Sequence, residues 1–121
     1  KGSSLYNHIK NGELKSEGNS ITEGIGSSRV TKNFGQAPID DAYSINDTDA
    51  LSVLFELLEK EGLNLGTSSG INIAGAMKLA ENLGPNKTIV TVLCDTSDKY
   101  RSKMFNKKFL TDKGLPFPKW L

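Results

Sequence analysis

Two adjacent serines stand at the start of a predicted helix. They belong to the segment Gly66-Thr67-Ser68-Ser69-Gly70, which joins an apolar run to a helical pattern over residues 71–83. A helix N-terminus carries a partial positive charge and free N–H groups, so a hydroxyl there either caps the helix or faces a ligand. Both interpretations stay open at this position, and they are compatible if Ser69 caps the helix and Ser68 contacts a ligand.

A glycine-rich segment, Gly24-Ile25-Gly26, is the second candidate for chemistry. It begins like a dinucleotide-binding fingerprint, but Arg29 stands where that pattern needs its third glycine, and no strand-to-helix context surrounds it. Two interpretations stay open. The segment is either a flexible surface turn or a backbone wall that a flat ligand approaches closely, because glycine has no side chain. We expect residues 21–38 to form one long irregular loop, of the kind that lines binding sites.

The other reactive side chains form no catalytic or metal-binding pattern. The chain has one cysteine, Cys94, and one histidine, His8, which excludes an internal disulfide and a closed zinc site built from soft ligands. Cys94 follows an apolar run and is expected to be a buried small hydrophobe. His8 has no fixed partner, and Lys78 is expected to extend its ammonium group from the outer face of its helix. We assign no metal ligand.

Two long helices must position these segments. Apolar residues recur at helical spacing from Ala50 to Leu58, after the capping run 46–49, and Gly62 ends this helix. The second helix covers residues 71–83, and its small residues predict close packing against a neighbour. A short helix around Leu5–Ile9 and a helical turn at residues 100–105 are also expected. Pro116 and Pro118 exclude regular structure in the C-terminal tail.

Strands are predicted at residues 41–45 and 88–94. The second is β-branched and apolar on both faces, which is typical of a parallel strand covered by helices on each side. The pattern therefore predicts an α/β fold with a parallel sheet and helices on both faces. Two strands cannot form such a sheet alone, so we expect further strands upstream. Because the sequence starts at Lys1 rather than Met, we expect it to be a piece of a longer chain.

Composition narrows the class of protein. A length of 121 residues suits one domain, and 15 basic against 14 acidic residues leave a formal charge of +1. The only arginines, Arg29 and Arg101, lie far apart, so no basic patch for nucleic acid is predicted. No apolar run approaches the roughly 18 residues of a membrane span. A reducing, cytosolic setting agrees with the single cysteine.

The order and spacing of several motifs resemble the C-terminal third of the cysteine synthase (O-acetylserine sulfhydrylase) family of fold-type II pyridoxal-phosphate enzymes. The likeness covers nearly the whole chain. It lies in the runs Thr22-Glu23-Gly24-Ile25-Gly26, Gly66-Thr67-Ser68-Ser69-Gly70-Ile71-Asn72-Ile73-Ala74-Gly75-Ala76, Thr88-Ile89-Val90-Thr91-Val92-Leu93-Cys94-Asp95, Lys99-Tyr100-Arg101-Ser102-Lys103 and Lys113-Gly114-Leu115-Pro116. The resemblance implies that residues 1–121 are the C-terminal segment of the large cofactor-binding domain, with the upstream two thirds absent.

The resemblance also implies roles for four residues. Ser68 would hydrogen-bond the pyridine nitrogen of pyridoxal 5'-phosphate, and Gly24, Ile25 and Gly26 would flank the cofactor and the substrate entrance. The lysine that forms a Schiff base with the cofactor, the substrate-carboxylate loop and the phosphate loop would lie upstream. We therefore assign no catalytic residue in this chain and expect it to be inactive alone. The turn Asp95-Thr96-Ser97-Asp98 lacks a glycine that relatives often carry, and it receives no role.

The function implied by the resemblance is replacement of the acetate of O-acetylserine by sulfide to give L-cysteine. A cytoplasmic homodimer is implied, with serine acetyltransferase as a possible partner. Two alternatives stay open. One is a β-replacement enzyme resembling cystathionine β-synthase, and the other is a non-catalytic relative that acts as a binding or regulatory protein.

Overall fold

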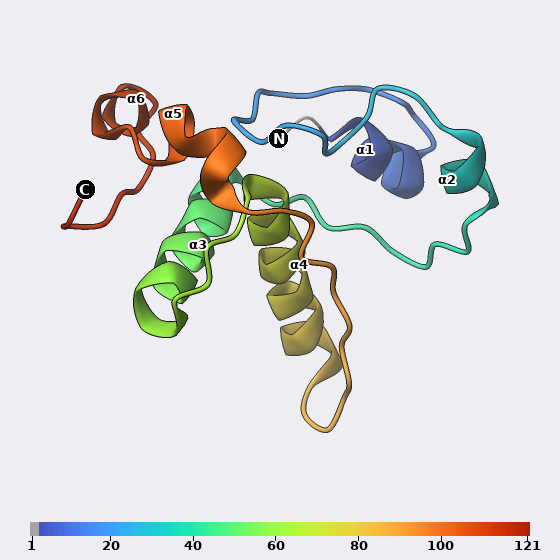
Figure 1. Ribbon diagram of the computed structural model, residues 1–121. Coiled ribbons are helices and arrows are strands. Elements are labelled where there is room, and N and C mark those ends of the chain that lie inside the picture. Colours follow the sequence, from blue (N-terminus) through green and yellow to red (C-terminus); the bar gives the residue numbers. More distant parts are fainter. Residues whose placement is uncertain (1–2) are drawn as a thin grey trace. The chain divides into compact units, whose positions relative to one another are not determined.

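The computed structural model describes residues 3–121, shown in Figure 1. The chain divides into two compact units, Lys1–Ser44 and Ile45–Leu121, and each is described by itself. The helices are α1 (Ser4–Asn11), α2 (Lys32–Gln36), α3 (Asp47–Glu61), α4 (Thr67–Leu83), the 3-10 helix η1 (Ser97–Tyr100), α5 (Arg101–Met104) and α6 (Lys107–Asp112).

The first unit contains α1 and α2 and the loops that follow them. The short N-terminal helix is confirmed, and Gly12 ends it with a φ of 74°. The prediction of one irregular loop over residues 21–38 is wrong at its end. There Thr31 Oγ1 accepts a hydrogen bond of 3.3 Å from the Phe34 N–H and starts α2. A hydrogen bond between Lys10 and Asp41 raises the pKa of the ammonium and lowers the pKa of the carboxyl.

The second unit begins with α3, which the sequence predicted closely. Asn46 Oδ1 accepts a hydrogen bond of 2.7 Å from the Asp49 N–H, and Gly62 ends the helix with a φ of 70°. Both ends are therefore satisfied by local groups that need no distant partner. The end of α4 at Leu83 is also confirmed, but its first residue is Thr67 rather than Ile71.

The packing of α3 against α4 forms the core of the second unit. A Cβ atom on Gly70 would lie 2.7 Å from the Ala50 carbonyl oxygen and 2.8 Å from the Leu54 side chain, so a glycine lets the two backbones approach. The predicted burial of α4 holds for its first turn and for Ala74, while Met77 is 53% exposed. The buried apolar residues of this unit are Ile45, Ala50, Leu51, Leu54, Phe55, Ala74, Met104 and Leu110.

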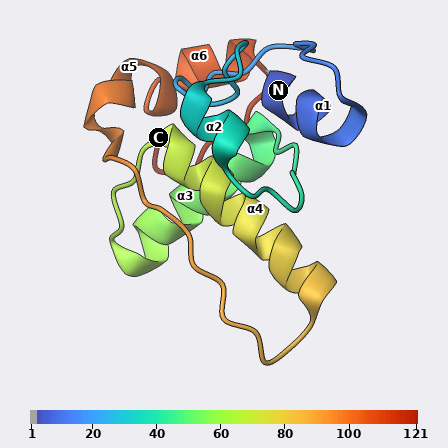
Figure 2. The same ribbon diagram turned by 90° about the vertical axis from the view of Figure 1, so that its right-hand side faces the viewer.

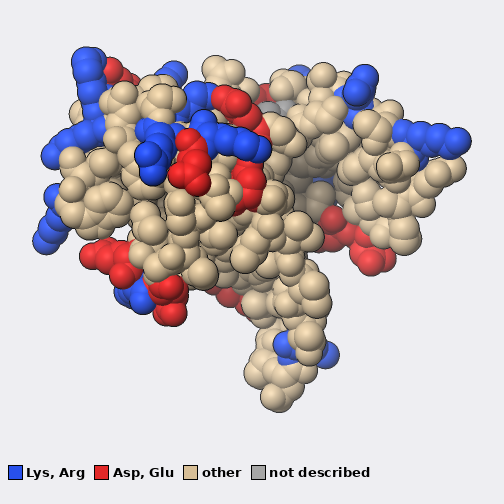
Figure 3. All heavy atoms as spheres, in the orientation of Figure 1, with Lys and Arg blue, Asp and Glu red and all other residues tan. Residues whose placement is uncertain are grey.

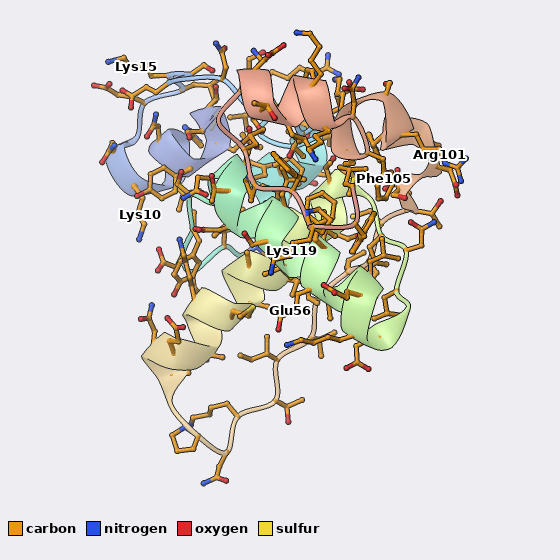
Figure 4. The ribbon with its side chains drawn as sticks, turned by 90° about the vertical axis from the view of Figure 1, so that its left-hand side faces the viewer. Lys10, Lys15, Glu56, Arg101, Phe105 and Lys119 are labelled. Carbon is orange, nitrogen blue, oxygen red and sulfur yellow. The ribbon has the colours of Figure 1, made fainter. Side chains whose placement is uncertain are left out.

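The C-terminal segments pack on α3 through aromatic rings. Phe55 of α3 lies edge-on to Phe105 and to Trp120, with ring centroids 6.3 and 6.2 Å apart. Figure 4 shows the side chain of Phe105 among the side chains that cover α3. The helical turn predicted at residues 100–105 is confirmed by η1 and α5, and the tail after Gly114 has no helix or strand, as its prolines predict.

The predicted parallel sheet is not found in residues 3–121. Neither residues 41–45 nor residues 88–94 form a strand, and the second segment runs back along α4 without regular structure (Figure 2). The physical reason is that a strand needs hydrogen bonds from a neighbouring strand, and no such neighbour lies in the described part of the chain. Val90 and Val92 are consequently 88% and 65% exposed.

None of the described helices is both long and apolar enough to cross a lipid bilayer.

Candidate cofactor-contact site

The N-terminus of α4 is the candidate site, and its cap differs from the prediction. Gly66 is the capping residue, with extended backbone and no side-chain hydrogen bond to the helix. The expectation that Ser69 caps α4 is wrong. Ser69 lies inside the first turn, where its hydroxyl accepts a hydrogen bond of 3.0 Å from the Cys94 N–H. It is fully buried, so it joins α4 to the segment that runs beside it.

Ser68 is the serine whose hydroxyl remains available to contact a ligand. It is 8% exposed, and within residues 3–121 its hydroxyl has no hydrogen-bond partner. Ser68 lies between Gly66 and Ser69, both of which are tied to the segment 92–95. Its position at the positive end of a 17-residue helix favours contact with a neutral or electron-rich atom rather than with a cation.

Three hydrogen bonds fix the first turns of α4 against residues 92–95. The Gly66 N–H donates to the Asp95 carbonyl at 2.8 Å, and the Asn72 side-chain amide donates to the Val92 carbonyl at 2.9 Å. The third is the contact between Ser69 and Cys94. Together they hold the candidate site in place with main-chain as well as side-chain groups.

Two buried polar atoms at this site are unpaired in residues 3–121. They are Thr67 Oγ1, on a residue that is 2% exposed, and Asp95 Oδ1. A buried polar atom without a partner is unusual in a folded protein and indicates that a water, a ligand or another part of the protein completes the site.

The predicted glycine loop lies in the first unit. Gly24 and Gly26 have φ angles of 80° and 74°, in the left-handed region that favours glycine, and Ile25 between them is 40% exposed. A Cβ atom on Gly24 would meet nothing within 4 Å. The backbone conformation therefore explains this glycine without a ligand, and its assignment to the cofactor site stays a prediction.

The remaining candidate side chains form no reactive arrangement with one another. Cys94 is exposed, so the prediction of a buried hydrophobe is wrong. His8 lies 6.4 Å from Phe34 between ring centroids, and Lys78 pairs with Asp49 at 3.4 Å from a half-exposed position. Among the described residues, no group of three or more histidine, cysteine or acidic side chains is arranged to hold a metal ion.

Comparison with known proteins identifies the family. Residues 2–95 match the model of the pyridoxal-phosphate dependent enzyme family. The chain belongs to this family. Relatives include cysteine synthase 1 of Emericella nidulans, 38% identical over 94% of this chain, and a cysteine synthase of Dictyostelium discoideum, 38% identical over 92%. The O-acetylserine dependent cystathionine beta-synthase of Bacillus subtilis is 38% identical over 68% of the chain and 27% of its own length.

The chain spans about a third of the length of these cysteine synthases, 32% in both cases. Family membership implies pyridoxal phosphate as the cofactor. The residues at the start of α4 fit one end of it, because the unpartnered Ser68 hydroxyl can bond a ring nitrogen and the helix end tolerates no further positive charge.

Sequence reasoning missed Asp95 and Tyr100. The Tyr100 hydroxyl donates a hydrogen bond of 2.8 Å to Asp95 Oδ2, directly beside Gly66. The available signal was the acidic residue at the end of the apolar segment 88–94, because polar groups at the ends of such segments commonly lie near ligands.

Proposed function

We propose that the full-length protein is a pyridoxal-phosphate dependent cysteine synthase that converts O-acetylserine and sulfide to L-cysteine. The names of these relatives, which match 92–94% of this chain, support this substrate pair. A cytoplasmic homodimer, with serine acetyltransferase as a partner, is part of the same proposal and comes from the family resemblance.

The observation that carries the proposal is the free hydroxyl of Ser68 at the start of α4. A neutral hydroxyl beside the positive end of a helix favours an unprotonated ring nitrogen, whereas a carboxylate partner would favour a protonated one. When bound, pyridoxal phosphate supplies an electron sink for breaking the bond to the acetate leaving group. Ser68 would keep that sink weak, which favours prompt loss of acetate followed by addition of sulfide.

Residues 24–26 would contribute a wall of backbone at the substrate entrance. Segment 88–94 would join a parallel sheet in the full-length protein, where its exposed valines would be covered by helices on both sides. In that arrangement the end of the segment would carry Asp95 to the edge of the sheet at which family ligands bind.

The test is substitution of Ser68 in the full-length protein loaded with pyridoxal phosphate. We expect Ser68→Ala to raise the cofactor dissociation constant about tenfold, because one buried hydrogen bond is lost. Ser68→Asp should shift the visible absorbance band and slow release of acetate from O-acetylserine. Ser52→Asp makes the same change at an exposed position of α3 and should alter neither.

Unchanged cofactor affinity and an unchanged band in both Ser68 variants would contradict the assigned contact. Cysteine formation by the wild-type protein is measured in the same assay with sulfide. Absence of cysteine, with homocysteine accepted in place of sulfide, would contradict the proposed substrate pair while leaving the cofactor contact intact.

A further inference from the structure

Asp95 contacts the residue that begins α4 through two different groups. Its main-chain carbonyl accepts the 2.8 Å hydrogen bond from the Gly66 N–H. Its carboxylate lies against the same glycine, because a Cβ atom on Gly66 would overlap Asp95 Oδ1. The φ of Gly66 is −77°, which any residue adopts. A side chain at position 66 would displace this carboxylate, so glycine leaves room for it, whereas the backbone conformation alone does not demand glycine.

Tyr100 holds the carboxylate in this place. Its hydroxyl donates a hydrogen bond of 2.8 Å to Asp95 Oδ2, and its ring edge would lie 2.8 Å from a Cβ atom on Gly66. Lys99 is more distant, with Nζ at 3.9 Å from Oδ2 and its side chain 76% exposed. The less exposed of the two contacts is thus made by Tyr100, and the ion pair with Lys99 adds little because solvent screens it.

The carboxylate is linked to Ser68 through the first turn of α4. Ser68 is two residues after Gly66 and one before Ser69, and both neighbours are tied to residues 94–95. A shift of Gly66 would therefore move the Ser68 hydroxyl, while Ser69 would hold the other side of the turn. The carboxylate also lies next to the positive end of α4, where a negative charge is favourable.

We propose that Asp95, held by Tyr100, is a positioning residue that fixes the direction of the Ser68 hydroxyl toward the ring nitrogen of pyridoxal phosphate. This inference rests on the proposed cofactor contact of Ser68. It assigns a role to the glycine-free turn after residues 88–94 and explains why Gly66, Asp95 and Tyr100 occur together.

The experiment is a double-mutant cycle in the full-length protein, with cofactor dissociation constant, absorbance band and thermal midpoint as readouts. Asp95→Asn preserves the size of the side chain and removes its charge. We expect it to raise the dissociation constant about tenfold and to shift the band of the bound cofactor. In the Ser68→Ala background the same substitution should change affinity less than about twofold, because the group that it positions is gone.

Asp98→Asn is the matched control. It removes a carboxylate from an exposed residue in the same turn, three positions away, and should leave affinity and band unchanged. Tyr100→Phe serves as the second variant if Asp95→Asn fails to fold. It keeps the ring beside Gly66, removes the hydrogen bond to Oδ2 and should reproduce the loss of affinity. In the cofactor-free protein, both variants should speed hydrogen exchange at the Gly66 amide.

The outcomes separate the two proposals. An effect of Ser68→Ala without one of Asp95→Asn and Tyr100→Phe overturns the positioning role alone. No effect of Ser68→Ala overturns the cofactor contact on which it rests. Two further outcomes would show that Asp95 stabilises the fold without acting through Ser68. One is a lower thermal midpoint with unchanged affinity and band. The other is an effect of Asp95→Asn that is just as large in the Ser68→Ala background.

Discussion

The pair of helices α3 and α4 and the segment 87–94 lie side by side in one unit, yet they are organised by different forces. The helices satisfy their own backbone groups and meet at a close contact around Gly70. The segment 87–94 has the β-branched composition of a buried strand but exposes Val90, Val92 and Leu93. Figure 3 shows the end of α4 and this segment as largely uncharged. The two helices are fully formed, whereas the segment 87–94 has no neighbouring strand to pair with in the described residues.

This difference shows which kind of secondary structure a short stretch of sequence can specify by itself. A helix closes hydrogen bonds four residues apart, so caps such as Asn46 and Gly62 are sufficient to place its ends. A strand closes its hydrogen bonds with a neighbour that can lie anywhere in the chain. The same sequence pattern at residues 88–94 therefore predicts a strand whose formation depends on residues elsewhere.

The close helix contact is tested by two glycines of α4. We expect Gly70→Ala to lower the free energy of unfolding by about 1–3 kcal/mol, because its Cβ would lie 2.7 Å from the Ala50 carbonyl oxygen. Gly75→Ala should instead raise it by up to about 1 kcal/mol. The nearest atom to a Cβ there is 3.9 Å away, and alanine is the better helix former. Urea unfolding of both variants measures the difference.

Equal effects of the two substitutions would show that α3 and α4 are not in close contact in solution. A stabilising Gly70→Ala would be the strongest contradiction, since no relaxation of the Leu54 side chain can move the Ala50 carbonyl away from the added methyl group.

The strand pattern is tested by Val90→Thr, which keeps the shape of the side chain and adds a hydroxyl. In the 121-residue chain Val90 is 88% exposed, so the free energy of unfolding should change by less than about 0.5 kcal/mol. In the full-length protein, the proposed sheet would bury the hydroxyl, and the loss should be about 1–2 kcal/mol. A small loss in both proteins would contradict the proposed sheet.

The candidate site shows how far sequence reasoning reaches. Its place at a helix start makes Ser68 a candidate ligand contact, and the family resemblance adds the ring nitrogen as its partner. The structure leaves its hydroxyl without a partner in residues 3–121. The use of Ser69 could not be predicted, because it depends on the Cys94 N–H from a segment 25 residues away. The contact of Asp95 with Gly66 was hidden for the same reason. Local patterns identify the helix end, and only the path of the distant segment shows how it is held.

The smallest expected change in stability comes from an exposed ion pair on α3. Glu56, labelled in Figure 4, accepts a hydrogen bond of 2.6 Å from Lys60 Nζ, which lowers the pKa of the carboxyl and raises the pKa of the ammonium. Because the folded state lowers the pKa of the carboxyl, the ionised Glu56 stabilises the fold at pH values above the ordinary pKa of 4.5. This stabilisation is lost as the pH falls through the folded pKa. Because the folded state raises the pKa of the ammonium, the charged Lys60 stabilises the fold at pH values below 10.5. This stabilisation is lost as the pH rises through the folded pKa.

The contribution of this pair is therefore fully present between those two pH values. We expect Glu56→Gln to lower the thermal midpoint slightly at pH 7 and to have no effect at pH 2.5, with the difference reduced in 1 M salt. Glu59→Gln removes the same charge from the same helix, where Glu59 acts on Lys60 through its charge alone, and should lower the midpoint less. Equal shifts for the two variants at pH 7 would show that the net charge of α3 matters and the pair does not. Helix stability would then come from its caps and its contact with α4 alone.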